Sequence, residues 1–431
     1  MKVHRAACAV LAVLCAAVAA DAPAAPLEPV WTLAQKEKPG VLETLKELTA
    51  IESGSRELAE LEKIAGVLAG RLQALGGKVE LIEATEADTV RLSDTPQKLG
   101  RMVKATFAGT GTRKILMIAH MDTVYPKGMG AKQPFRVDGD RVYGLGIADA
   151  RGGLATILHT LALLKAMSFR DYGTLTVFIN PDEEIGSPGA RNHHMRLGAG
   201  HDAVMSFEGG GNLQDDRVRL ATSGHALALL TVRGRASHAG AAPELGVNAL
   251  TELAHQIVQL RDLSDPATGV KVNWTLARAG VVFNMIPPEA QATGDVRVAR
   301  IVDYDGVEER LRERIRTKLL PEAQVELVFE RRFPPLEPRP ASRALAAHAQ
   351  GVYSRELGRE LKVVEDAAGG FTDAANASLK TAAPVVEGFG LRGFGAHTTN
   401  AEYILISSIE PRLYLAARMI MEISSGKAPL K

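Results

Sequence analysis

Histidine, aspartate and glutamate residues recur in this sequence at the ends of short apolar or glycine-containing runs. Two imidazoles and several carboxylates without a thiolate suit zinc or a similar borderline divalent ion, with oxygens enough for two ions. The set therefore predicts metal-dependent chemistry. Its members are His120 and Asp122, Asp149, Glu183 with Glu184, Glu208, and His397.

The acidic pair Glu183 and Glu184 predicts a division of labour, because adjacent side chains diverge and are poorly placed to bind one ion together. One carboxylate would be a ligand and the other a general base, which typically contributes roughly a hundredfold to ten-thousandfold in rate. Taken alone, the pair is also typical of a solvated helix start, where the helix dipole favours acidic residues.

His120 and Asp122 are two residues apart, so in an extended segment both side chains point to one face. Asp122 can then hold the far nitrogen of His120 and fix its tautomer, as carboxylates beside metal-bound histidines commonly do. The competing interpretation is an aspartate that starts a turn before Thr123.

Asp149 lies in a glycine-rich segment, residues 144–153, that leads into a predicted helix. Flanking glycines let the backbone come close to a ligand and aim the carboxylate. A dinucleotide-binding turn is the alternative, but the segment lacks the third glycine of that fingerprint and no long apolar strand precedes it.

Apolar runs predict the strands that position these side chains. Residues 115–118, 175–179 and 204–207 run directly into His120, the acidic pair and Glu208. Helical periodicity falls between the strands, which predicts an α/β fold with a mostly parallel, covered sheet. In such sheets ligands bind beyond the carboxyl ends of the strands. Residues far apart in sequence are therefore expected at one rim.

The pattern of apolar and polar residues changes near residue 217, where longer alternating strands begin. This change predicts an inserted α+β unit. About 400 mature residues exceed what one hydrophobic core usually organises, which favours two domains. The predicted division is a signal peptide at 1–25, a catalytic domain at 26–216 that resumes at 329–431, and an inserted lid or dimerisation domain at 217–328.

Residues 1–25 have the features of a secretory signal, because Lys2 and Arg5 precede an alanine- and leucine-rich run with small-residue cleavage options. Both cysteines of the sequence, Cys8 and Cys15, lie inside it, so the mature chain would hold no disulfide. The apolar run is too short for a membrane anchor, and the expected location is the bacterial periplasm or medium. A net charge of +1 gives no electrostatic case for a nucleic-acid or anionic-membrane partner.

Five segments together resemble the M20 metallopeptidases. The resemblance extends over almost the whole mature chain and is nearest to the secreted bacterial glutamate carboxypeptidases. The combination of motifs is highly specific. The segments are residues 120–124 (HMDTV), 146–149 (GIAD), 182–187 (DEEIGS), 237–240 (SHAG) and 395–397 (GAH).

The resemblance implies a role for each member of the metal set. Glu183 would be the general base and acid, and Asp122 the hydrogen-bonding partner of His120. Each subunit would bind two zinc ions, with cobalt or manganese as acceptable substitutes. Asp149 would bridge the ions, with His120 and Glu208 on one ion and Glu184 and His397 on the other.

The resemblance also implies functional residues outside the metal set. His238 in the inserted domain would stabilise the oxyanion in the site of a partner subunit, so a homodimer formed through the inserted domain is expected. Arg332, with Arg331 as its competitor, would clamp the carboxylate of a small peptide or acyl-amino acid substrate by a bidentate contact. Asn273 would add a polar contact to the substrate. Paired arginines and loop asparagines also often merely face solvent.

Ala150, Gly209 and Phe371 depart from the family pattern. The first two remove no ligand, whereas Phe371 replaces a glycine in a substrate-facing loop and would reshape the side-chain pocket. A glutamate carboxypeptidase is the main hypothesis, and a dipeptidase or an N-acyl amino acid amidohydrolase with a different pocket is the alternative. A non-enzymatic binding protein that kept the fold would not need every ligand and base position.

Overall fold

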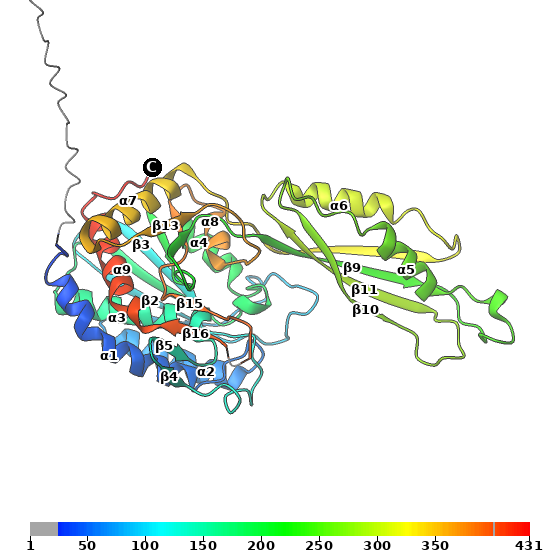
Figure 1. The fold of residues 1–431 in the computed structure, drawn as a ribbon, viewed down its shortest axis with the longest axis horizontal. Coiled ribbons are helices and arrows are strands. Elements are labelled where there is room, and N and C mark those ends of the chain that lie inside the picture. Colours follow the sequence, from blue (N-terminus) through cyan, green and yellow to red (C-terminus); the bar gives the residue numbers. More distant parts are fainter. Residues whose placement is uncertain (1–24, 400) are drawn as a thin grey trace, which may run out of the picture.

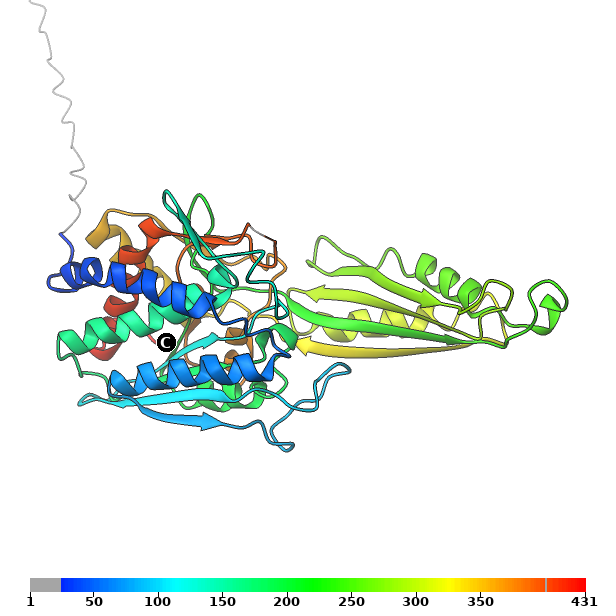
Figure 2. The ribbon, with the colours of Figure 1, turned by 90° about the horizontal axis from the view of Figure 1, so that it is seen from below.

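The structure is a computed structural model that describes residues 25–399 and 401–431. Nearly all of the predicted signal peptide therefore lies outside the described residues. Figure 1 and Figure 2 show a broad α/β body that contacts, at one side, an elongated unit built from the middle of the chain. The strands that lead into the predicted metal ligands belong to the broad body.

The broad body is built on a six-stranded sheet with the order β1-β2-β6-β3-β7-β14. The strands from β6 to β14 run parallel, as the sequence predicts, whereas β1 pairs with β2, and β2 with β6, in antiparallel fashion. Residues 83–101 form no helix, so no crossover makes the first pair parallel. The strands are β1 (Lys78–Ile82), β2 (Met102–Ala108), β3 (Lys114–His120), β6 (Thr174–Asn180), β7 (Ala203–Ser206) and β14 (Val385–Val386).

Helices cover both faces of this sheet, because successive strand residues alternate between two hydrophobic cores. In β3, Ile115 and Met117 pack into the larger core, and Leu116 and Ile118 into the smaller one. The larger core is closed by α1 (Val30–Thr49), α2 (Leu58–Ala74), α3 (Gly152–Ala166), α7 (Pro340–Leu357) and α9 (Ile409–Ser424), and the smaller one by α4 (Arg191–Ala199) and α8 (Asp373–Ser378).

The elongated unit is a four-stranded antiparallel sheet with the order β10-β11-β9-β12, packed against two helices around its own hydrophobic core. It has the α+β character that the sequence predicts. Its elements are β9 (Gly224–Arg233), α5 (Ala249–Gln259), β10 (Lys271–Ala279), β11 (Glu289–Val298), α6 (Asp303–Arg314) and β12 (Gln324–Phe333).

Two strands run across the limits that sequence texture predicts for the inserted unit. β8 (Asp216–Arg219) pairs with β13 (Leu361–Val364) in the broad body, although the predicted limit falls at 217. β12 stays paired with β9 up to Phe333, past the predicted limit at 328.

A small second sheet of the broad body contains β4 (Arg136–Asp138), β5 (Arg141–Tyr143), β15 (Gly393–Phe394) and β16 (Tyr403–Leu405).

Helix α3 is buried nearly all round, which accounts for its apolar sequence. Among the described residues, Ile147–Ala166 is long and apolar enough to cross a membrane, but 89% of its apolar window is buried inside the protein. The start of α3 lies so close to β7 that a Cβ at Gly153 would be 1.6 Å from the carbonyl oxygen of Phe207. Glycine at this position therefore lets the helix begin beside Glu208.

Candidate metal centre

Three neighbouring strands of the central sheet end at one pocket. His120 is the last residue of β3, the acidic pair forms a short 3-10 turn after β6, and Glu208 lies just beyond β7. The cavity at this edge has a volume of about 410 Å³, within the usual range for a small-molecule site. Its lining includes Asp149, Glu183, Glu184, Glu208 and His397.

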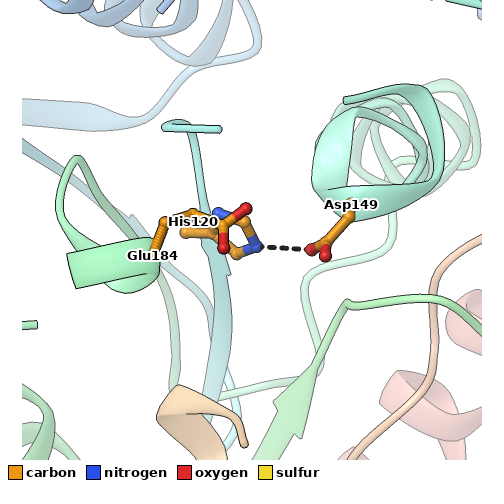
Figure 3. Close-up of side chains that lie close together, drawn as sticks. All are labelled: His120, Asp149 and Glu184. Carbon is orange, nitrogen blue, oxygen red and sulfur yellow. Dashed lines mark hydrogen bonds and ion pairs between the residues drawn. The ribbon is translucent and has the colours of Figure 1, made fainter. Parts of the chain in front are cut away.

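Asp149 lies between the two histidines of the metal set. Its Oδ1 is 3.0 Å from His120 Nε2, and its Oδ2 is 3.3 Å from His397 Nε2. Glu184 Oε2 is 3.2 Å from the same His397 nitrogen. Donor atoms of His120, Asp149 and Glu184 all lie within 4.8 Å of one another (Figure 3). Each histidine thus faces a different oxygen of one carboxylate.

Asp122 connects His120 to the acidic pair. It is fully buried, and its Oδ1 lies 3.3 Å from His120 Nδ1. Its carboxylate also accepts the backbone N–H groups of Glu183 and Glu184, both at 3.1 Å, and the Ser55 hydroxyl at 2.7 Å. The predicted contact between Asp122 and His120 is present, and the same carboxylate also fixes the turn that presents both glutamates.

Burial and neighbouring carboxylates raise the pKa values of three glutamates in the pocket. Burial, opposed by His120 and reinforced by Glu208 and Glu184, raises the pKa of Glu183 well above its ordinary value. Burial also raises the pKa of Glu208 well above its ordinary value. Burial together with Asp149 raises the pKa of Glu184 to about 7. Like charges in a water-poor pocket disfavour full ionisation.

The two histidines respond in the opposite direction. Hydrogen bonds to Asp149 and Glu184 raise the pKa of His397 to about 10. Burial lowers the pKa of His120, but hydrogen bonds to Asp122 and Asp149 outweigh it and raise that pKa well above the ordinary value. Both shifts come from the neighbouring carboxylates, and a divalent cation that binds such a cluster takes the place of the protons on the imidazoles. The donor set fits zinc, cobalt or manganese.

The loop that carries His397 holds it in an uncommon backbone conformation. Its φ of 62° lies in the left-handed region, which residues other than glycine rarely adopt. The N–H and hydroxyl of Thr398 both donate to the carbonyl of Gly395 and close the turn. Strained backbone tends to persist at functional sites, where the surrounding structure holds it. Here it accompanies an imidazole directed at Asp149 and Glu184.

Glu402 positions the turn around Asp149. The pattern of metal-ligand residues in the sequence does not identify Glu402 as part of the site. It is 1% exposed. Its Oε1 accepts the backbone N–H groups of Ala148 and Asp149 at 2.9 and 3.1 Å, and its Oε2 accepts that of Gly146 at 3.1 Å. The hydroxyl of Tyr125 donates to the same Oε2 at 2.8 Å. Glu402 thus does for Asp149 what Asp122 does for the acidic pair.

The predicted carboxylate clamp, Arg332, lies beside the turn of the acidic pair but outside the pocket lining. It donates to the Ile185 carbonyl at 3.0 Å. Its guanidinium also pairs with Glu330 and Asp94, each at 2.7 Å. Its competitor, Arg331, pairs with two carboxylates of α6.

The structure places His238 and Asn273 in the elongated unit, and neither lines the pocket. Asn273 is exposed on strand β10, opposite Asp295. His238 is also exposed and bridges to Met285. Its Nδ1 accepts the backbone N–H groups of Gly240 and Ala241 at 3.1 and 3.0 Å.

Phe371 lines the pocket, as its place in a substrate-facing loop predicts. Its ring stacks on Phe333 with the centroids 4.4 Å apart and on His225 at 5.5 Å. The guanidinium of Arg297 lies 5.4 Å from the same ring centroid. Because these three partners belong to β12, β9 and β11, Phe371 connects the pocket wall to the base of the elongated unit.

A mostly parallel α/β sheet with acidic and imidazole side chains at the ends of its parallel strands, joined to an antiparallel inserted unit, is an arrangement that suits a metal-dependent hydrolase. Residues 116–422 match the model of peptidase family M20/M25/M40, and the chain belongs to this family. The expected family is therefore confirmed.

Individual relatives agree with this assignment. The chain is 43% identical to Carboxypeptidase G2 of Pseudomonas sp. (strain RS-16) over 394 residues, which cover 91% of this chain and 92% of the relative. It is 27% identical to acetylornithine deacetylase of Proteus mirabilis over 53% of this chain and 56% of the relative. The structure of the di-peptidase Dug1p from Saccharomyces cerevisiae matches the fold with a TM-score of 0.74 at 14% identity, covering 92% of this chain and 98% of that one.

Proposed function

We propose that this chain is a dinuclear zinc carboxypeptidase that hydrolyses the amide bond to a C-terminal amino acid, with glutamate preferred. The observation that carries the proposal is the position of Asp149, which faces His120 with one carboxylate oxygen and His397 with the other. The identity of 43% to Carboxypeptidase G2 supports cleavage at a carboxyl terminus.

Asp149 would bridge the two ions, and two residues would complete the shell of each ion. When bound, the ions would polarise the amide carbonyl and lower the pKa of the attacking water. His120 and Glu208 would complete the shell of one ion, and Glu184 and His397 the shell of the other. These four residues and Asp149 lie in or directly beneath the pocket.

Glu183 lines the pocket beside the proposed metal ligands, where hydrolysis needs a proton carrier. It takes a proton from the attacking water as the new C–O bond forms, and it delivers that proton to the leaving nitrogen as the C–N bond breaks. Burial raises the pKa of Glu183, which favours the protonated form of the second step, whereas bound cations would lower that pKa and favour the carboxylate that the first step needs. Asp122 holds the Glu183 backbone in place for both steps.

A homodimer formed through the elongated unit would bring His238 to a partner's pocket. Strand β10 is an edge strand of its sheet, and edges of this kind readily pair with another chain. Three large apolar side chains on or just after β10 lie open to solvent, Leu276 at 62%, Val281 at 89% and Phe283 at 99%. A second copy of the chain would cover this surface, which a monomer rarely exposes.

We also assign residues 1–25 to a cleaved export signal, which places the enzyme in the periplasm or the medium. The support is the order of Lys2 and Arg5, an apolar run and small residues. N-terminal sequencing of the protein from a periplasmic extract tests this. A mature protein that still begins at Met1 would contradict it.

The second candidate function is an N-acyl amino acid amidohydrolase or dipeptidase with the same metal residues. It is favoured by Phe371, whose ring occupies the pocket wall, and by the similarity to acetylornithine deacetylase. Such an enzyme would use the same water chemistry on a different side chain.

Turnover of the mature protein on folate, glutamyl dipeptides and N-acyl amino acids separates these functions. The proposal expects release of C-terminal glutamate, which stops after dialysis against a chelator and returns with zinc. Faster cleavage of N-acyl amino acids without a glutamate would favour the second candidate. Glutamate release that continues after complete metal removal would contradict the metal mechanism.

A further inference from the structure

The pocket wall contains an arginine as well as the residues of the proposed metal site. Among the described residues that line it, Arg219 is the only lysine or arginine, whereas five carboxylates line the same cavity. Four of these carboxylates belong to the proposed metal site and general base. The fifth, Glu387, accepts the Thr372 hydroxyl and the backbone N–H of Glu208, and it makes no ion pair with Arg219.

Arg219 is held rigidly at the end of strand β8. Its backbone N–H donates to the Glu387 carbonyl at 2.8 Å, and its own carbonyl accepts the Glu387 N–H at 3.0 Å. The guanidinium Nη1 donates to the carbonyl of Gly209 at 2.8 Å. Since Gly209 follows Glu208 directly, the cation sits a short distance along the wall from a proposed metal ligand.

The remaining guanidinium donors of Arg219 have no hydrogen-bond or ion-pair partner in the part of the chain that the structure describes. A guanidinium has five N–H groups in a planar fork that matches a carboxylate bidentately. Arg332 and Arg331 differ from Arg219, because Arg332 is paired with Glu330 and Asp94, and Arg331 with residues of α6.

The charge of the loaded pocket also favours an anion at Arg219. Two divalent cations would offset the four carboxylates of Asp149, Glu183, Glu184 and Glu208. The fifth carboxylate, Glu387, accepts hydrogen bonds from Thr372 and the Glu208 N–H rather than from Arg219, so the guanidinium stays available to a negative substrate. The wall of the same pocket also contains Thr222 and Asn212 as polar residues and Phe371 as an apolar surface. This combination suits a short aliphatic chain that ends in a carboxylate.

We propose that Arg219 is a specificity-determining residue whose guanidinium binds a carboxylate of the substrate. The carboxylate is either that of the C-terminal side chain or the α-carboxylate, and both present the same chemistry. This inference rests on the proposed carboxypeptidase function, and it moves the recognition of the substrate anion from Arg332 to the pocket wall.

The test compares kcat/KM of the zinc-loaded wild type with Arg219→Gln and Arg219→Lys. The substrates are an N-acyl glutamate, its glutamine analogue and its α-amide. Arg219→Gln is expected to reduce by about 10- to 100-fold the preference for the glutamate over one of the two neutral analogues, because a charge-assisted bidentate contact is lost. The analogue whose rate converges identifies which carboxylate is bound. Arg219→Lys should retain an intermediate preference, since the charge remains but the fork does not.

Arg217→Gln is the matched control, because Arg217 lies on the same strand and pairs with Asp215 at 2.8 Å outside the pocket lining. Its substrate preference should stay at the wild-type value. Unchanged preference for both analogues in Arg219→Gln, with zinc content retained, would overturn the inference while the hydrolysis itself still supports the proposed function.

A binding measurement keeps the two proposals separable. If the zinc-loaded wild type hydrolyses none of the substrates, the proposed function fails, and calorimetry with glutarate still tests Arg219. Weaker glutarate binding to Arg219→Gln, by about 10-fold or more, supports the anion site. Equal affinity for the wild type and Arg219→Gln contradicts it.

Discussion

The carboxylate of Glu402 accepts the backbone N–H of Asp149 at 3.1 Å, although the two residues are far apart in sequence. The bond belongs to a group of three, because the same carboxylate also accepts the N–H groups of Gly146 and Ala148. The direction of the Asp149 side chain is therefore set by a residue that is not itself one of the proposed metal ligands.

Replacement of Glu402 by glutamine is expected to weaken metal binding. An amide keeps the size of the side chain but has only one acceptor oxygen, so the Gly146–Asp149 turn loses part of its anchor. Removal of a group that hydrogen-bonds to a metal-binding segment typically lowers metal affinity by about 10- to 100-fold. A loss of zinc affinity in this range is expected for Glu402→Gln, measured by competition with a chromophoric chelator. Glu410→Gln is the control, since Glu410 pairs with Lys38 and not with the Gly146–Asp149 turn. Wild-type affinity in Glu402→Gln would show that the turn holds its shape without the carboxylate.

Glu183→Gln is expected to separate catalysis from metal binding. Glutamine cannot carry the proton from water to the leaving nitrogen, so kcat should fall by roughly 100- to 10,000-fold. Zinc content should remain at the wild-type value, because Glu183 is assigned no ligand role. The neighbouring Glu184→Gln should lose metal as well as activity. A Glu183→Gln enzyme with full kcat would remove the proposed general base.

Replacement of Phe283 by aspartate, at the edge of the elongated unit, should change the oligomeric state. Phe283 is 99% exposed just after edge strand β10, and a charge there is costly to bury in an interface. Sedimentation of Phe283→Asp should give a monomer, whereas Val328→Asp on the opposite edge strand should stay dimeric. If His238 acts in the partner's pocket, the monomer should also lose activity with its zinc retained. A wild-type protein that sediments as a fully active monomer would contradict the dimer.

The buried pair between Arg412 and Asp216 is expected to stabilise the broad body. Arg412 is fully buried, and its Nε lies 3.0 Å from Asp216 Oδ1. Asp216→Ala would leave a buried guanidinium without a counter-charge, a change that costs about 3 to 5 kcal/mol in comparable cases. Asp262→Ala, which removes an exposed partner of Arg314, should cost under about 1 kcal/mol. Urea unfolding followed by circular dichroism measures both. Equal midpoints for the two variants would contradict the assignment.

The packing of α7 against α9 should weaken in acid. Burial raises the pKa of Glu356, but the bidentate contact with Arg418 and the Tyr414 hydroxyl outweigh it, so the pKa of Glu356 is lowered. A carboxylate whose pKa is lowered by folding contributes stability above its unfolded pKa of about 4.3 and loses it as the pH falls through the folded value. The urea midpoint of the wild type should therefore fall more steeply below about pH 4 than that of Glu356→Gln. Parallel curves would show that Glu356 is not responsible.

The parallel part of the sheet and the gathering of the proposed metal ligands at one edge could be predicted from sequence, because both depend on local patterns. Apolar runs end directly at His120, the acidic pair and Glu208, and parallel strands bring such ends together. The antiparallel edge strand β1 and the helix α1, which continues through Pro39 to Val30, follow instead from tertiary packing. Buried Val30 and Ala34 hold that extra length against the core.

The residues that position the site were not predictable in the same way. Glu402 acts through backbone N–H groups some 250 residues earlier in the chain, and no spacing rule in the sequence marks such a contact. Arg332 and Arg219 look equally basic in sequence. Only the pairing of Arg332 with Glu330 and Asp94, and the place of Arg219 in the pocket wall, distinguish them.

Metal content per chain tests the bridged pair around Asp149 most directly. Purified mature protein loaded with zinc and freed of excess should contain two zinc ions per chain, as measured by elemental mass spectrometry. Asp149→Asn should lose both ions, and His397→Ala should retain one, because Asp149 serves both shells and His397 only one. A wild type that holds a single ion, or an Asp149→Asn protein that keeps two, would contradict the dinuclear site.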